Sequence, residues 1–399
     1  RKICKTINTV YLATDPDREG EAIAWHLFSD FSEKKLLKDK EVKRITFNEI
    51  TSSAIKQAIN SPREIDQDLV DAYLARRILD HLIGFKVSPL VWRHAPPAKS
   101  AGRVQSPSLR IICERETERD KHIKEEYWPI SSKFRYDDFI FDVDYARDYK
   151  FDAELVKINE EDLKKNPISV EKDVKEIESE LKSSEFYIKS IETKPQSSSP
   201  NPPFRTSTLQ MTASSFLGFT ADRTMRAAQN LYEAGLITYL RTDGINISTS
   251  PNTGEPFSEE NPGPPPLQEI RNVIVEKFGD KFLSDQVRVY KSKVKNSQEA
   301  HEAIRPTNIK TYPENINLGQ DEQKLYTLIW NRTISSQMSN SQHERKKLVI
   351  CSEGNKYVFN ASSRKTLFEG FETLSKKDSL GIIEFPKNLK ENENVNLTE

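Results

Sequence analysis

The feature that most constrains the fold is a short apolar strand that runs directly into an acidic turn and then a helix. Residues 9–14 are β-branched and apolar, residues 15–19 carry three carboxylates, and residues 20–31 place apolar side chains on one broad face. A second strand at 45–47 and a second helix at 50–59 repeat the pattern. Because such alternation is typical of a parallel sheet covered by helices, the first part of the chain predicts an α/β unit.

Farther along the chain the hydrophobic period changes, which indicates further domains. Residues 68–84 and 107–124 read as helices, and residues 127–157 alternate with period two, as antiparallel strands do. The second helix carries an apolar stripe of Leu109, Ile112 and Cys113. A Ser/Pro/Asn-rich stretch at 195–203 predicts a linker. The length of 399 residues fits two or three domains.

Composition excludes several classes of protein. A membrane span needs ~18 consecutive apolar residues, and the sequence contains no such stretch. The three cysteines form no C-x-x-C pair, which argues against a zinc ribbon or a disulfide framework and fits a reducing compartment. The net charge is −1, yet residues 75–110 contain seven basic residues and one acidic residue. This block favours a polyanion such as nucleic acid, and the alternative is a solvated basic face.

The acidic turn predicts a metal site. Asp15, Asp17 and Glu19 alternate, so their side chains point the same way if the chain is extended. Clustered carboxylates repel one another unless a cation lies between them, and hard oxygen ligands select Mg²⁺. The alternative is an acidic helix cap, since carboxylates are favoured in the first helical turn.

A tyrosine and an arginine form the second candidate site. Residues 236–240 predict a strand, on which Tyr239 and Arg241 lie on the same face. A tyrosine oxygen that attacks a phosphodiester needs the phosphate charge neutralised, and a fixed arginine does this. The alternative is an ordinary core tyrosine. His301 and Arg305 are close in sequence and could contact a phosphate, with a structural histidine as the alternative.

The loop between the two helices has the composition of a nucleic-acid site. Residues 100–106 combine small residues with Arg103 and Gln105, which can bind phosphate or base edges. Phe85 and Trp92 offer flat faces on which bases can stack, unless they are core residues. Basic residues interleaved with aromatic ones favour a single strand over a duplex.

The chain carries five motifs whose sequences and order resemble those of bacterial-type type IA DNA topoisomerases. They are D-P-D-R-E-G-E-A-I-A-W-H at 15–26, R-I-T-F-N-E-I-T at 44–51, S-A-G-R-V-Q-S at 100–106, L-Y-E-A-G-L-I-T-Y-L-R-T-D at 231–243 and Q-E-A-H-E-A-I-R-P at 298–306. The resemblance extends from about Thr9 to Phe371. It implies a multi-domain α/β and α+β fold, with a partial Toprim domain and a toroidal core of helical and β-strand domains.

The resemblance also implies a division of the chain. Five parts are expected: a partial Toprim domain (1–63), the first part of a helical DNA-groove domain (64–124), the first part of a β-rich arch domain (125–200), a tyrosine-bearing gate domain (201–312) and a return through the arch (313–399).

The family's activity is Mg²⁺-dependent and ATP-independent. The resemblance implies that Tyr239 cuts one DNA strand through a 5′-phosphotyrosine and that Arg241 stabilises the phosphate, with Glu19 and His301 as further catalytic residues. It also implies that Mg²⁺ is held by Asp15, Asp17 and Glu19. Passage of the other strand and religation would relax negative supercoils. The positions that match the family's single-strand DNA groove are Arg76, Arg77, Asp80, Phe85, Trp92, Ser100, Ala101, Gly102, Arg103, Val104 and Gln105, with Arg241 beside the cut. A monomer in the cytoplasm, associated with the chromosome, is expected, and an organelle stays open.

The sequence departs from the family pattern in several places. The catalytic Glu and nearby Lys that open the family's Toprim domain are expected upstream of Arg1, and zinc-binding modules after residue 399. Gly244 stands where the family usually has Ser, and His81 where it usually has Arg. The chain is therefore expected to be a fragment, and an alternative function is single-stranded DNA binding without cleavage. A Toprim nuclease or primase fits less well, because neither needs the Tyr239 motif.

Overall fold

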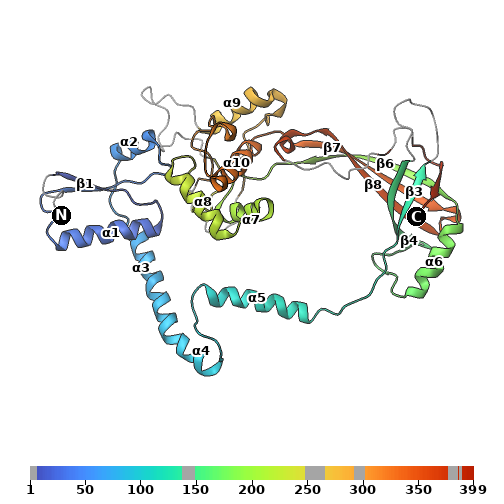
Figure 1. The fold of residues 1–399 in the computed structure, drawn as a ribbon, viewed down its shortest axis with the longest axis horizontal. Helices are drawn as coiled ribbons and strands as arrows, with labels where there is room; N and C mark the ends of the chain where they lie inside the picture. Colours follow the sequence, from blue (N-terminus) through green and yellow to red (C-terminus); the bar gives the residue numbers. More distant parts are fainter. Residues whose placement is uncertain (1–6, 137–148, 248–265, 292–301, 376–384, 386–388) are drawn as a thin grey trace. The chain divides into compact units, whose positions relative to one another are not determined.

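The computed structural model describes residues 7–136, 149–247, 266–291, 302–375, 385 and 389–399 (Figure 1). The chain divides into two compact units, each made of two stretches of sequence. One unit comprises Arg1–His122 and Asn201–Gln337, and the other comprises Ile123–Pro200 and Met338–Glu399. The finer division into five parts stays a prediction.

The first unit begins with the predicted α/β alternation. Strands β1 (Thr9–Leu12) and β2 (Glu41–Arg44) pair in parallel, with helix α1 (Arg18–Glu33) between them in sequence. The strand predicted at 45–47 is wrong, because the register aligns Glu41–Arg44 with the whole of β1 and β1 then ends in the acidic turn. Helix α2 (Ser52–Asn60) follows, and the Thr51 hydroxyl caps it by accepting from the amide of Ala54 at 3.2 Å.

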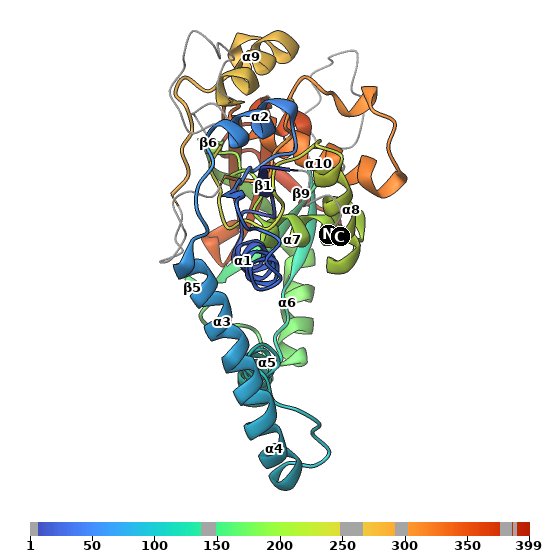
Figure 2. The ribbon, with the colours of Figure 1, turned by 90° about the vertical axis from the view of Figure 1, so that its left-hand side faces the viewer.

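Three helices then carry the basic segment of the chain. Helix α3 (Gln67–Leu82) continues through a π-helical turn (Ile83–Val87) into α4 (Ser88–His94), so that α3 and α4 form one arm (Figure 1, Figure 2). Helix α5 (Gln105–Asp120) has no buried residue. The predicted helix is confirmed, and its apolar stripe is exposed in the described structure, since helical spacing of apolar residues creates a face that can be buried but supplies no partner for it.

The remainder of the first unit is a helical cluster. Its helices are α7 (Thr206–Leu217), α8 (Ala221–Glu233), α9 (Pro266–Phe278) and α10 (Gln320–Ser335). The segment predicted as a strand at 236–240 forms only an isolated bridge, between Ile237 and Pro306. Consecutive residues from Ile237 to Leu240 are all buried, so the segment is packed on both sides and does not extend a sheet.

The second unit is an antiparallel sheet with one helix. Its elements are β3 (Ser131–Tyr136), β4 (Tyr149–Ile158), β5 (Glu161–Asp162), α6 (Glu171–Ser183), β6 (Phe186–Ser198), β7 (Ser341–Ser352), β8 (Tyr357–Phe368) and β9 (Asn394–Leu397). The order is β3-β9-β6-β7-β8-β4-β5, and the sheet closes on itself because β3 also pairs with β4. Packed rings of Phe134, Phe186 and Phe359 form part of its core.

The linker predicted at 195–203 is wrong in its first half. Strand β6 continues to Ser198 and pairs with β7 along the whole of that stretch, with Pro195 opposite Glu344. A proline lacks the amide donor, but it can lie in a strand where its position needs no hydrogen bond.

Candidate active site

The acidic turn is held in shape by its own side chains and by a glycine. Asp17 caps α1, because its Oδ1 accepts from the amide of Gly20 at 2.7 Å, and the Thr14 hydroxyl donates to the carbonyl of Gly20 at 2.6 Å. A Cβ at Gly20 would lie 2.1 Å from the carbonyl oxygen of Asp15, so only glycine fits there. The helix-cap alternative is thus confirmed for Asp17, which leaves its second oxygen, Oδ2, for other contacts.

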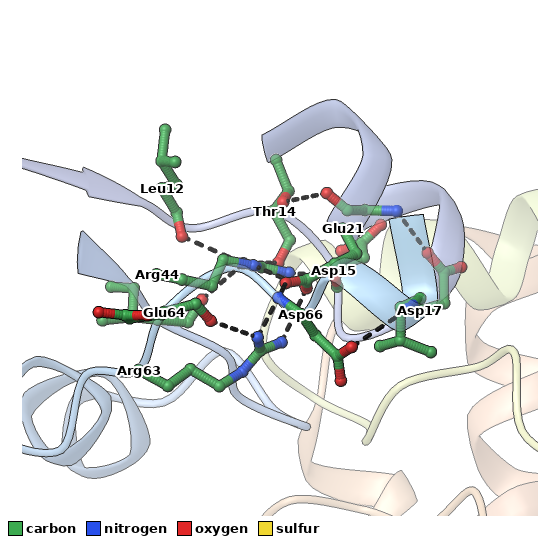
Figure 3. A network of polar contacts seen from close by, with 12 residues as sticks. Leu12, Thr14, Asp15, Asp17, Glu21, Arg44, Arg63, Glu64 and Asp66 are labelled. Atoms are coloured by element: carbon green, nitrogen blue, oxygen red, sulfur yellow. Dashed lines mark hydrogen bonds and ion pairs between the residues drawn. The ribbon is translucent and has the colours of Figure 1, made fainter. Parts of the chain in front are cut away.

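A buried arginine fixes the backbone of the same turn. The guanidinium of Arg44 donates to the carbonyl oxygens of Leu12, Thr14, Asp15 and Ile45, at 2.7 to 3.1 Å, and to the Glu21 carboxylate at 3.0 Å (Figure 3). Both side chains of this ion pair are fully buried. A single side chain that holds four carbonyl groups leaves the turn little freedom to move.

Glu21 has a second set of donors in the same network. Arg63 donates to both of its oxygens, at 2.8 and 2.7 Å, and the amide of Asp66 donates at 2.7 Å (Figure 3). Burial alone would raise the pKa of Glu21, but these hydrogen bonds and the charge of Arg44 outweigh it and lower the pKa to about 2. The carboxylate therefore stays ionised beneath the acidic turn.

The phenol of Tyr239 points at this turn. Its hydroxyl donates to Asp17 Oδ2 at 2.6 Å, and its amide donates to the carbonyl of Asn48 at 2.7 Å. Burial, the hydrogen bond to Asp17 and the charges of Asp17 and Asp15 all raise the pKa of Tyr239 above its ordinary value. The Nη1 of Arg241 lies 3.9 Å from Asp17 Oδ2, and its charge lowers the Tyr239 pKa in part. Asp17 thus forms one group with Tyr239 and Arg241, although Tyr239 lies 222 residues farther along the chain.

A second cluster of buried ion pairs lies next to the segment that carries Tyr239. Arg305 donates to Glu302 at 2.6 Å and to Glu49 at 3.4 Å, and both pairs are almost wholly buried. The Thr238 hydroxyl accepts from the amide of Arg305 at 3.0 Å. Sequence reasoning noticed Arg305 only as a phosphate contact and missed Glu49 and Glu302. Both residues lie within family motifs, Glu49 in 44–51 and Glu302 in 298–306, and membership of a motif was the signal that could have identified them.

The space around Tyr239 is small. It is a cavity of about 30 Å³ lined by Pro16, Asp17, Asn48, Thr238, Tyr239, Arg241, Thr242 and Glu302. This volume admits only a water molecule or two. In the described structure the Tyr239 phenol is therefore accessible to water but not to a larger ligand.

The carboxylates fit a cation only in part. Burial and the charge of Asp17 raise the pKa of Asp15, and no described residue donates a hydrogen bond to the Asp15 carboxylate. Despite this partial burial Asp15 is exposed, so its carboxylate is open to water or to a hydrated Mg²⁺, which proteins bind through one or two carboxylates while the ion keeps several waters. Glu19 instead pairs with Arg76 at 2.9 Å. Within the described ranges no three His, Cys, Asp or Glu side chains gather into a metal-binding group.

The predicted DNA-groove residues mostly meet around one large cavity. Its volume is about 810 Å³, and its walls include Asp80, Phe85, Trp92 and every residue from Ser100 to Gln105. Arg103 pairs with Asp80 at 2.9 Å, and Ser88 holds the loop through the amide of Ala101 at 3.0 Å. Phe85 is 72% exposed and Trp92 57% exposed, so the alternative that both are core residues is wrong.

Three predicted residues lie elsewhere. Arg76 and Arg77 are exposed on α3 and do not line the large cavity, and Arg76 instead joins α3 to the acidic turn through Glu19. His301 lies outside the described residues, so its role stays a prediction. Its neighbour Glu302 lines the small cavity at Tyr239.

A glycine lets the tyrosine segment approach the α/β part closely. Gly235 has φ +71°, and a Cβ there would lie 2.4 Å from the carbonyl oxygen of Ile50. We expect Gly235→Ala to lower the free energy of unfolding by about 2–4 kcal/mol, from backbone strain and the clash. Gly218 has φ +66° but open space around it, so Gly218→Ala should cost only about 1–2 kcal/mol. Urea denaturation measures both, and equal losses would contradict the close contact.

Two models of known protein families match the sequence of this chain. A family model described as "DNA topoisomerase" matches residues 64–399, and one described as "Toprim domain" matches residues 1–50. The predicted fold class, a Toprim part followed by mixed helical and strand domains, is confirmed by these matches and by the structure.

Individual relatives give the same result. DNA topoisomerase 1 of Rickettsia bellii (strain RML369-C) is 45% identical over 381 residues, which cover 93% of this chain and 45% of that protein. DNA topoisomerase 1 of Rickettsia prowazekii (strain Madrid E) is 42% identical over 414 residues, with 100% and 50% coverage. Full-length topoisomerase I from Thermotoga maritima superposes with a TM-score of 0.72 at 33% identity, over 99% of this chain and 59% of that one. The chain thus spans about half the length of the curated relatives it matches.

Proposed function

The chain belongs to the bacterial type IA DNA topoisomerase family, and from that premise we propose that it contributes the cleavage and religation centre of such an enzyme. Tyr239 cuts one strand of DNA and forms a 5′-phosphotyrosine, the second strand passes through the gap, and religation restores the backbone. Negative supercoils relax as a result. The observation that carries the proposal is the hydrogen bond of 2.6 Å from the Tyr239 hydroxyl to Asp17, with Arg241 beside it.

The proposed chemistry starts from a protonated tyrosine. Its raised pKa means that the phenol keeps its proton until a base removes it, and Asp17 already accepts that hydrogen bond. The phenol oxygen attacks phosphorus as its proton passes to Asp17, the bond between phosphorus and the 3′-oxygen breaks, and the 3′-oxygen takes that proton from Asp17 and leaves as a hydroxyl. Arg241 offsets the negative charge that develops on the phosphate. Because one phosphoester replaces another, its energy is conserved and religation needs no ATP.

Asp15 and Asp17 are the residues that would hold Mg²⁺, and Asp17, which accepts hydrogen bonds from Gly20 and Tyr239 in the described structure, would first have to release Tyr239. The bound ion would supply positive charge next to the phosphate, in addition to that of Arg241. Glu19, predicted as a third ligand, would first have to leave Arg76. Glu19 and His301 are proposed to assist the cleavage step.

The test of the proposed activity is covalent trapping. The chain is incubated with labelled single-stranded DNA and Mg²⁺ and then denatured, and the protein is examined for attached label. An adduct supports cleavage through Tyr239. DNA binding without any adduct would support the alternative, a module that binds single-stranded DNA without cutting it.

The proposed partner is a single-stranded segment of negatively supercoiled DNA, bound along α3, α4 and the loop 100–105. Phe85 and Trp92 lie exposed on the large cavity, where unpaired bases can stack on them. A monomer is proposed, with the bacterial chromosome as its site of action. None of the helices among the described residues is long and apolar enough to cross a membrane.

The salt dependence of DNA binding tests the basic surface of α3. We expect log affinity to fall linearly with log salt concentration, and Arg77→Ala to reduce that slope by about 0.7, the loss of one phosphate contact on a single strand. Lys172→Ala on α6 is the matched control, because Lys172 is an exposed cation outside the proposed groove. Fluorescence anisotropy measures the binding. A flat salt dependence, or equal slopes for the two variants, would count against this surface.

A further inference from the structure

An ion pair joins the α/β part of the chain to the residues beside Tyr239. Arg305 Nη2 lies 3.4 Å from Glu49 Oε2, and the two side chains are 1% and 3% exposed. Glu49 precedes α2, and the Thr51 hydroxyl donates to its Oε1 at 2.9 Å. Arg305 also donates to Glu302, three residues earlier, at 2.6 Å. Because Glu302 already supplies a negative charge from the same segment, neutralising Arg305 does not by itself require Glu49.

Arg305 is tied in turn to the residue that precedes Tyr239. The amide of Thr238 donates to the carbonyl of Arg305 at 2.9 Å, and the Thr238 hydroxyl accepts from the amide of Arg305 at 3.0 Å. The amide of Tyr239 donates to the carbonyl of Asn48, the neighbour of Glu49, at 2.7 Å. Residues 48 and 49 therefore hold the tyrosine segment at two adjacent points, once through its backbone and once through the Arg305 side chain.

Stability alone is a poor explanation for this ion pair. Burial raises the pKa of Glu49, and the charge of Arg305 only partly offsets that effect. Removing two charged groups from water costs about as much as their attraction returns, so a buried pair adds little stability over apolar side chains. Directed contacts do provide a defined position. The Tyr239 phenol needs one, since a displacement of about 1 Å can slow a reaction by about 10²-fold.

We propose that Glu49 is a positioning residue for the cleavage step and that it acts through Arg305. The pair keeps Thr238 and Tyr239 in the register that brings the phenol to Asp17, at 2.6 Å. In the described structure Thr238 lines the small cavity at Tyr239 and Glu49 does not, so Glu49 affects the reaction through geometry and not by contact with DNA. The proposal deepens the proposed function and rests on it.

Glu49→Gln tests the proposal, because it keeps the size of the side chain and an oxygen for Thr51 and removes the charge that faces Arg305. The measured quantity is the rate of adduct formation with labelled single-stranded DNA and Mg²⁺, at DNA concentrations that saturate the protein. We expect this rate to fall about 10- to 100-fold, while fluorescence anisotropy gives an unchanged dissociation constant for DNA. A lower rate at unchanged affinity separates a displaced nucleophile from a weakened DNA site.

Glu372→Gln is the matched control. Glu372 is 19% exposed and pairs with Arg364 at 3.2 Å in the other unit, so the same substitution should lower the melting temperature and leave the rate of adduct formation unchanged. Arg305→Lys is a second variant, because it keeps a buried cation and loses the forked guanidinium that reaches both carboxylates. It should slow the reaction by a similar factor, and the double variant Glu49→Gln/Arg305→Lys should be no slower than the slower single variant.

Each outcome decides the proposal. If Glu49→Gln folds and forms adduct at the wild-type rate, the inference is overturned and the proposed function stands. The inference also fails if Glu372→Gln slows the reaction equally, if only the affinity for DNA falls, or if the two single losses multiply in the double variant. If circular dichroism shows that Glu49→Gln does not fold, Arg305→Lys decides, and a wild-type rate in that variant overturns the inference. If the wild type forms no adduct, the inference and the proposed function fail together.

Discussion

Replacing Tyr239 with phenylalanine should lower the yield of covalent protein–DNA adduct by at least about 10³-fold, because the attacking oxygen is removed and no neighbouring group replaces it. The fold should survive. The ring still packs against Tyr232, and the hydrogen bond to Asp17 is the main interaction lost, at a cost of about 1–3 kcal/mol. Gel analysis of labelled, denatured reactions measures the adduct, and circular dichroism checks the fold.

The matched control for this experiment is Tyr326→Phe. Tyr326 is also buried and also loses one hydrogen bond, but its hydroxyl faces the carbonyl of Thr311 and has no contact with the acidic turn. It should form adduct at the wild-type level. An adduct that persists in Tyr239→Phe would mean that another residue is the nucleophile, and the assignment of the site would then be wrong.

The largest expected loss of stability comes from Arg44. Arg44→Ala should lower the free energy of unfolding by about 3–5 kcal/mol, since it removes the fully buried one of the two arginine partners of Glu21 and leaves the turn carbonyls without donors. Arg63→Ala is the comparison, because Arg63 binds the same carboxylate from a side chain that is 38% exposed. Solvent can replace part of that contact, so a loss of about 1–2 kcal/mol is expected. Urea denaturation that ranked Arg63→Ala as the more damaging change would contradict this role.

The same network predicts a response to acid. The pKa of Glu21 is lowered in the folded chain to about 2, below its ordinary value of 4.5. A lowered folded-state pKa means that the stabilisation is fully present above about pH 4.5 and is lost as the pH falls towards 2. Glu21→Gln should flatten this part of the stability curve, and a wild-type curve that is already flat between these values would count against the network. The measurement is denaturation at a series of pH values.

Part of the site was readable from the sequence because its residues are close in the chain. Asp15 and Asp17 follow a β-branched strand and precede a helix, so local geometry alone places them at one strand end. Tyr239 and Arg241 alternate within one apolar segment, and the structure brings Arg241 close to the same carboxylate that Tyr239 contacts. The family motifs added the order of these parts along the chain.

Other features of the fold could not be predicted, because a hydrophobic pattern shows which residues can be buried but not which residues will cover them. The pattern of the segment 236–240 is that of a strand, yet the segment forms only one isolated bridge and bonds mainly to residues 303–307. The apolar stripe of α5 has the spacing of a face that can be buried and is exposed in the described structure. The composition of residues 195–203 is typical of a linker, yet strand β6 continues past Pro195 to Ser198 because it pairs there with β7.

Local spacing and motifs within short segments were enough to predict the α/β beginning, the chemistry of the candidate residues and the family. Which groups meet became known from the folded chain: the Tyr239 hydroxyl with Asp17, Glu19 with Arg76, and Arg305 with Glu49. Those pairs join residues 57 to 256 positions apart. Contacts at such separations depend on how whole elements pack, and no local pattern records that.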